Sequence, residues 1–199
     1  MNEYIQSLVD AKKLDISLQP DRWKFDDNPY IISGPCSVES EEMIVDWAHK
    51  MKDVGVNALR GGAYKPCTYP ITEEVGSNGW KEGLREDGLR YLRIASVETG
   101  LPIVSEIMDS NQINELTMDC IDIVQVGTRN FQNYTLLDAL GELDIPILLK
   151  RGTWGTIDEI LGAVERILVR GNEKVAICLR GVVGAPSYRH VFPSIRWAP

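Results

Sequence analysis

The sequence has no long hydrophobic run. None of its apolar segments approaches the ~20 residues that a membrane-spanning helix requires. The stretch at residues 1–15 has no apolar core of the kind found in signal peptides. We therefore expect a cytoplasmic protein with no membrane partner.

The sequence also has fewer basic than acidic residues. The chain has 21 Lys and Arg residues against 29 Asp and Glu residues, which gives a formal net charge of -8. A general nucleic-acid-binding protein presents a basic face, so we expect no nucleic-acid partner. The four cysteines form no CxxC pair, and free thiols in a reducing compartment are the default for such spacing. No GxGxxG follows the first apolar segment, which disfavours a dinucleotide-binding fold.

The rest of the composition is typical of a globular chain. Its 199 residues are 44% hydrophobic and 25% charged, enough to bury one sizeable core. We expect a lead-in helix and loop over residues 1–29, with one catalytic domain over residues 30–199. The lead-in carries no recognisable chemistry.

Short apolar segments alternate with amphipathic ones along this domain. Six of the apolar segments are predicted strands: Tyr30–Ser33, Val56–Leu59, Leu101–Ser105, Ile121–Val126, Ile145–Leu149 and Val175–Leu179. The segments between them predict helices over Glu41–Val54, Asp87–Glu98, Ser110–Met118 and Gln132–Leu140, and a fifth that begins with a capping box of Thr156 and Glu159. All-apolar strands separated by crossover helices indicate a parallel sheet.

Cations beside glycine or proline recur where these strands end. They are Arg60, Lys65, Arg129, Lys150, Arg151 and Arg180. In a TIM-type (β/α) barrel all strand ends meet at one mouth, so the pattern predicts that fold and a small, multiply charged anion as its ligand. Arg151 stays open between anion binding and ion pairing, because neighbouring side chains on a strand point to opposite faces.

The barrel is apparently truncated after the sixth strand. A complete barrel has eight strands and typically ~250 residues. Only Gly181–Pro199 follow here, and they are interpreted as a loop-like tail. A partly built barrel exposes strand edges and apolar surface, so we expect a homo-oligomer or a fragment of a longer chain.

Six motifs together resemble a known family. They are GPCSVES at Gly34–Ser40, RGGAYKP at Arg60–Pro66, SEIMD at Ser105–Asp109, VGTRNFQN at Val126–Asn133, LLKRG at Leu148–Gly152 and LRG at Leu179–Gly181. In this order they closely resemble 3-deoxy-D-arabino-heptulosonate 7-phosphate (DAHP) synthase of the compact class I type. The resemblance implies a metal-dependent barrel that condenses phosphoenolpyruvate with erythrose 4-phosphate, the first step of the shikimate pathway.

The resemblance also implies roles for individual residues. Lys65 is the candidate for proton transfer, and Cys36 is a candidate ligand of a divalent metal (Mn²⁺, or Fe²⁺, Co²⁺ or Zn²⁺). Around the substrates the implied ligands are Arg60 and Lys150 for the phosphoenolpyruvate carboxylate and reacting carbons, Arg129 and Arg180 for its phosphate, and Thr68 for the aldose phosphate. Fixed cations offset the repulsion between two phosphorylated substrates.

Three departures from the family pattern keep alternatives open. Cys67 stands where the family has an arginine that contacts the second substrate's phosphate, and Leu179 stands where it often has a glutamate. The family's remaining metal ligands lie on the seventh and eighth βα units. One alternative is a catalytically inactive phosphoenolpyruvate-binding barrel that acts as a regulator or subunit partner; the other is the reaction of the sister family, 3-deoxy-D-manno-octulosonate 8-phosphate synthase.

Overall fold

A computed structural model describes residues 30–66, 83–184 and 188–191, with backbone only for 182–184 and 188–191. The predicted lead-in at 1–29 lies outside these residues, as do Cys67 and Thr68. The described chain divides into two compact units, an N-terminal unit within residues 30–125 and a C-terminal unit within residues 126–191. No helix in the described ranges is long and apolar enough to cross a membrane.

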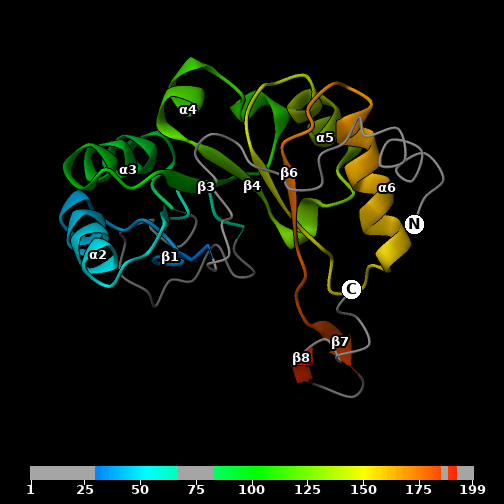
Figure 1. Cartoon of the computed structure of the whole chain (residues 1–199), viewed down its shortest axis with the longest axis horizontal. Coiled ribbons are helices and arrows are strands. Elements are labelled where there is room, and N and C mark those ends of the chain that lie inside the picture. The colour runs from blue at the N-terminus through cyan, green and yellow to red at the C-terminus, as the bar shows by residue number, and fades with distance from the viewer. Residues whose placement is uncertain (1–29, 67–82, 185–187, 192–199) are drawn as a thin grey trace, which may run out of the picture. The chain divides into compact units, whose positions relative to one another are not determined.

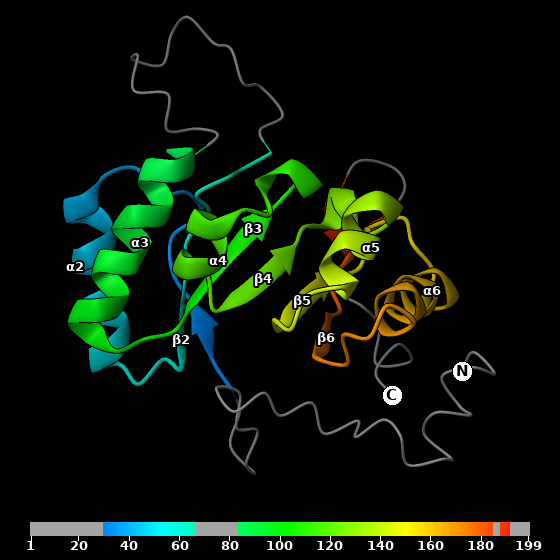
Figure 2. The ribbon, with the colours of Figure 1, turned by 90° about the horizontal axis from the view of Figure 1, so that it is seen from above.

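The N-terminal unit is a parallel sheet covered by helices. Its elements are β1 (Ile32–Ser33), α2 (Glu41–Asp53), β2 (Ala58–Arg60), α3 (Arg85–Thr99), β3 (Ile103–Ile107), η2 (Ser110–Gln112), α4 (Glu115–Cys120) and β4 (Ile123–Val126). β1 pairs in parallel with β2, and β2 with β3. The strand order continues to β4. Figure 1 shows α2 and α3 side by side, and Figure 2 shows α4 beside β3 and β4.

Local sequence signals fix the ends of these helices. The side chain of Ser40 accepts a hydrogen bond from the Met43 amide and so caps the N-terminus of α2. Gly100 ends α3 in the left-handed conformation (φ 75°), which glycine adopts without strain. The strands supply the core, where Leu59, Ile103 and Val124 are fully buried.

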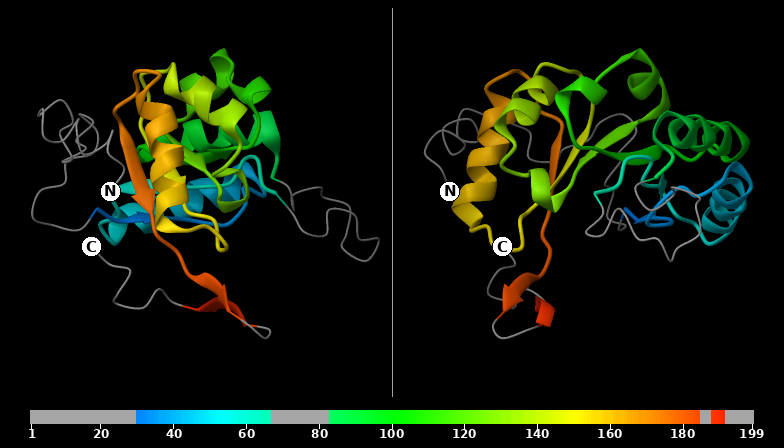
Figure 3. Two further views of the ribbon diagram at one scale, coloured as in Figure 1. Left: turned by 90° about the vertical axis from the view of Figure 1, so that its right-hand side faces the viewer. Right: turned by 180° about the vertical axis from the view of Figure 1, so that it is seen from behind.

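The C-terminal unit repeats the pattern with two parallel strands and adds an antiparallel pair. It holds η3 (Thr128–Asn130), α5 (Tyr134–Gly141), β5 (Ile147–Lys150), α6 (Ile157–Leu168), β6 (Val175–Cys178), β7 (Val182–Gly184) and β8 (Tyr188–Val191). β5 and β6 pair in parallel from Ile147↔Val175 to Lys150↔Cys178. The predicted capping box of Thr156 and Glu159 is present at the start of α6. Figure 3 shows α6 lying along β6.

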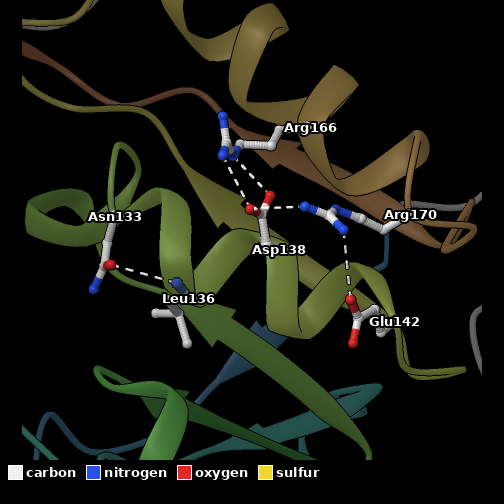
Figure 4. A network of polar contacts seen from close by, with 6 residues as sticks. All are labelled: Asn133, Leu136, Asp138, Glu142, Arg166 and Arg170. Atoms are coloured by element: carbon white, nitrogen blue, oxygen red, sulfur yellow. Dashed lines mark hydrogen bonds and ion pairs between the residues drawn. The ribbon is translucent and has the colours of Figure 1, made fainter.

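An ion-pair cluster joins α5 to the end of α6 (Figure 4). Asp138 Oδ2 on α5 accepts from Arg166 Nη2 at 2.9 Å and from Arg170 Nη2 at 3.1 Å. Arg170 also lies 3.6 Å from Glu142. Hydrogen bonds from Arg166, supported by the charges of both arginines, hold the pKa of Asp138 below its ordinary value. The cluster therefore fastens two helices that cover β5 and β6.

The prediction of a loop-like tail after the sixth strand is wrong for its described part. β7 and β8 form an antiparallel hairpin there. The residues Val182-Val183 and Tyr188–Val191 suit strands, and Gly184-Ala185-Pro186-Ser187 between them has the residue types of a turn. The six parallel strands were all predicted, and no strand end differs from its predicted position by more than two residues.

Candidate active site

The first half of the candidate site is built where β1 and β2 end. The GPCS loop packs directly on the RGG segment, because a Cβ on Gly62 would lie 2.5 Å from the carbonyl oxygen of Cys36. The Val38 amide donates to the Gly62 carbonyl at 3.0 Å. Arg60 Nη1 donates to the carbonyls of Pro35 and Cys36 at 3.0 and 3.1 Å. The arginine is thus fixed by two backbone acceptors and remains half-buried.

Cys36, Arg60 and Lys65 form one electrostatic group. The Cys36 side chain is exposed. Partial burial raises the pKa of its thiol, but hydrogen bonds and charge from Lys65 and Arg60 outweigh that effect and lower the pKa overall. A thiol of lowered pKa is deprotonated more readily, and the thiolate is the form that binds metals and reacts with electrophiles.

A buried polar pair lies at the ends of β3 and β4. Gln125 Nε2 donates to Glu106 Oε2 at 2.8 Å, and both side chains are at most 5% exposed. Ser105, also buried, accepts from the Ala63 amide at 3.3 Å and so ties β3 to the segment after Arg60. The strand ends of the N-terminal unit therefore carry one carboxylate among their cations.

The second half of the candidate site lies in the C-terminal unit. Arg180, just after β6, donates from Nη1 to Thr128 Oγ1 at 2.8 Å. Lys150 ends β5 half-buried, and Arg129 is exposed within η3. Each of these residues lies at or just after the end of a strand, as the sequence predicts.

Arg151 departs from every other strand-end cation because it is completely buried. It is 1% exposed and is the largest fully buried side chain of the described residues. Its Nη1 donates to the carbonyls of Gly152 and Gly155 at 3.2 and 2.6 Å, and its Nη2 donates to the carbonyl of Arg180 at 2.5 Å. It therefore binds backbone oxygens rather than presenting its charge at the surface.

Sequence reasoning placed some of these residues and missed others. It named Arg60, Lys65 and Cys36, which the structure brings together, and Arg180, which lies against Thr128. The sequence does not single out Thr128 or Gln125. The available signal for Thr128 is its place beside Arg129 in the segment GTRN, and for Gln125 it is a polar residue in the apolar strand before that segment. The convergence of the two halves on one ligand stays a prediction.

The described residues do not by themselves fit a divalent metal. No group of three or more His, Cys, Asp or Glu side chains in the described ranges is placed to hold one. The lowered pKa of Cys36 favours the thiolate that ligates metals, but its neighbours Arg60 and Lys65 are cations. Since divalent sites need several ligands, Cys36 alone does not make one.

Comparisons with solved structures agree with this fold. The chain superimposes on a phospho-2-dehydro-3-deoxyheptonate aldolase (DAHP synthase) from Thermotoga maritima with a TM-score of 0.72 and 38% identity, over 82% of this chain and 45% of that one. A truncated 3-deoxy-D-arabino-heptulosonate 7-phosphate synthase from the same organism gives 0.68 and 37%, over 82% and 55%. The fold is that of a TIM-type (β/α) barrel, of which this chain carries six parallel strands with cations at or just after the strand ends.

Sequence comparisons give the family. The profile of the DAHP synthetase I family matches residues 14–195, and the chain belongs to that family. It is 43% identical to a phospho-2-dehydro-3-deoxyheptonate aldolase from Thermotoga maritima over 76% of this chain and 42% of that protein. A 2-dehydro-3-deoxyphosphooctonate aldolase from Syntrophotalea carbinolica is 28% identical over 76% and 54%. The chain thus spans about half the length of these relatives.

Proposed function

We propose that this chain serves the condensation of phosphoenolpyruvate with erythrose 4-phosphate, which gives DAHP and phosphate. The observation that carries the proposal is the cluster of Arg60, Lys65 and Cys36 at strand ends, in a chain of the DAHP synthetase I family. Preference for the heptulosonate product rests on 43% identity to a heptonate aldolase against 28% to an octonate aldolase.

In this proposal different cations bind different groups of the phosphoenolpyruvate. Arg60 and Lys150 bind the carboxylate and flank the reacting carbons, while Arg129 and Arg180 bind the phosphate. Arginine suits the phosphate because its planar fork matches two oxygens at once. The fixed positions of Arg60 and Arg180 in the structure support these roles, since a preorganised cation needs no rearrangement when the anion arrives.

Lys65 handles a proton in the proposed reaction. A bond forms between C3 of phosphoenolpyruvate and the aldehyde carbon of erythrose 4-phosphate, and the aldehyde oxygen takes up a proton that the Lys65 ammonium can donate. Water then adds at C2, and phosphate leaves. Thr68, which lies outside the described residues, is proposed to bind the aldose phosphate.

We also propose a divalent metal requirement for the complete site. Family membership supports it, and Mn²⁺, Fe²⁺, Co²⁺ and Zn²⁺ are the candidates. Cys36 is the described residue best suited to ligate such an ion, because a deprotonated thiol binds soft and borderline metals. Its other ligands must come from outside the described residues, so no step of the reaction is assigned to the metal here.

The test is phosphate release from phosphoenolpyruvate, with erythrose 4-phosphate and Mn²⁺, with and without a chelator. The proposal predicts turnover that depends on both substrates, stops with the chelator and is lost in Lys65→Met. A matched Lys52→Met variant, which changes an exposed lysine on α2, is expected to keep wild-type turnover. Turnover with arabinose 5-phosphate in place of erythrose 4-phosphate would instead assign the octulosonate reaction.

A second candidate is a barrel that binds phosphoenolpyruvate without catalysis. It is favoured by the lack of a three-ligand metal group among the described residues. Phosphoenolpyruvate binding that Arg129→Ala abolishes, in a chain with no turnover under any metal, would support this candidate over the synthase. Such a chain would act as a regulator or as a subunit partner.

We further propose that the chain is cytoplasmic and self-associates. Ile177 on β6 and Leu179 just after it are each 38% exposed, which leaves apolar surface next to the last parallel strand. Sedimentation equilibrium is expected to give a mass above the 22.3 kDa of one chain. A single 22.3 kDa species that melts cooperatively would contradict self-association.

A further inference from the structure

The buried Arg151 lies between two segments of the C-terminal unit. On one side it donates to Gly152 and Gly155, the two ends of a turn that is closed by a Gly155 N–H bond to the Gly152 carbonyl at 3.0 Å. On the other side it donates to the carbonyl of Arg180, after β6. The guanidinium thus connects the segment after β5 with the segment after β6.

The turn that accepts from Arg151 is itself fixed by packing. A Cβ on Gly152 would lie 2.2 Å from the ring of Phe131, and one on Gly155 would lie 2.7 Å from it. Phe131 is fully buried, and its ring centroid lies 5.9 Å from that of Trp154. Because the ring of Phe131 prevents the turn from moving toward it, the carbonyls of Gly152 and Gly155 stay in place. They are therefore fixed acceptors for the Arg151 guanidinium.

The contact with Arg180 reaches the candidate phosphate site. Arg151 holds the backbone of Arg180, and the side chain of Arg180 in turn donates to Thr128 Oγ1 at 2.8 Å. Thr128 directly precedes Arg129, the other proposed phosphate ligand. Arg151 therefore fixes the backbone of Arg180, and Thr128 fixes its guanidinium.

We propose that Arg151 is a positioning residue, which acts through Arg180 to preorganise the phosphate-binding half of the site. This inference rests on the proposed function, because it assigns the anion to Arg180. Arg151 touches no ligand in this account. Arginine is required because its planar fork can meet carbonyls on two sides at once, whereas the single ammonium of lysine is a compact point charge.

The first experiment compares phosphoenolpyruvate affinity by calorimetry in the full chain. The variants are Arg151→Lys, Arg180→Lys and the double variant, with Arg170→Lys as the control on the α5–α6 surface. Arg151→Lys is expected to weaken binding about tenfold, and the double variant is expected to bind no more weakly than Arg180→Lys. Losses that multiply in the double variant would overturn the proposal, as would an Arg151→Lys chain with wild-type affinity.

The second experiment needs no ligand and separates this inference from the proposed function. Arginine side-chain NMR spectra are recorded for the ligand-free wild type and Arg151→Lys, with the Arg180 Nε–H signal assigned by its loss in Arg180→Lys. A shifted Arg180 signal in Arg151→Lys, with no shift in Arg170→Lys, supports positioning even if the wild type binds no phosphoenolpyruvate. An unchanged Arg180 signal overturns it.

A wild-type measurement covers the case in which Arg151→Lys does not fold. Three fixed acceptors restrict rotation of the guanidinium, so the Arg151 Nη protons are expected to give separate signals that exchange slowly with water. A single averaged signal for these protons would overturn the proposal without any variant.

Discussion

At the scale of single residues, neighbouring charges decide what each side chain can do. Cys36 is exposed, yet hydrogen bonds and charge from Lys65 and Arg60, at and after the end of β2, lower the pKa of its thiol. Sequence motifs predicted that these three residues share a site. They could not predict that Arg151 is buried, because its neighbours in sequence resemble those of the other strand-end cations. The backbone carbonyls that face Arg151 explain how its charge can be buried.

The lowered thiol pKa predicts how Cys36 reacts with iodoacetamide. The alkylation rate, followed at the Cys36 peptide by mass spectrometry, is expected to rise with pH around a midpoint below the ordinary value for cysteine. Lys65→Met removes a cation that favours the thiolate, so the midpoint is expected to move to higher pH, while the Lys52→Met control leaves it in place. The same midpoint in all three proteins would show that Lys65 does not tune the thiol.

At the scale of elements, close backbone approaches and helix contacts hold the site together. The GPCS loop rests on Gly62, and α5 is fastened to the end of α6 through Asp138. Alternating apolar and amphipathic segments predicted the six parallel strands and the helices between them. They did not predict the antiparallel pair of β7 and β8, because such short strands lack the crossover pattern that the other strands follow.

Gly62→Ala is expected to destabilise the chain, because the new Cβ would lie 2.5 Å from the carbonyl oxygen of Cys36, a backbone atom that cannot easily move. We expect a loss of about 2 kcal/mol in the free energy of unfolding measured with urea. The matched control is Gly162→Ala, which places the same methyl group in open space on α6. There alanine is expected to stabilise the helix by about 0.5–1 kcal/mol. Equal effects at the two positions would contradict the packing described.

Asp138→Asn tests the α5–α6 cluster through the pH dependence of stability. The arginines lower the pKa of Asp138 in the folded state, so its contribution is present above the unfolded pKa of about 3.9 and is lost as the pH falls through the lower folded value. The urea midpoint of Asp138→Asn is therefore expected to lie below that of the wild type at pH 7, and the gap is expected to close below about pH 4. Asp46→Asn, in an exposed pair with Lys50, provides the control and is expected to show little change. A gap independent of pH would rule out an ionic role for Asp138.

At the scale of the whole molecule, the chain is part of a TIM-type barrel with its charge concentrated at strand ends. Although the protein has a net charge of -8, sequence and structure agree that cations lie at or after its strand ends. They are Arg60, Lys65, Arg129, Lys150 and Arg180. Sequence alone predicted this fold class, because parallel strands with apolar interiors follow from pattern. The metal ligands and the partner surface could not be predicted in the same way, since the chain spans about half the length of its relatives.

The most direct test of the central claim is a calorimetric titration of the full chain with phosphoenolpyruvate. We expect one molecule bound per chain, with affinity reduced roughly 10- to 100-fold in Arg60→Lys and likewise in Arg180→Lys, because each loses charge-assisted hydrogen bonds to the anion. A loss in both variants would show that Arg60 and Arg180 each contribute to phosphoenolpyruvate binding. A wild-type chain that binds no phosphoenolpyruvate, or one whose affinity neither substitution changes, would contradict the account.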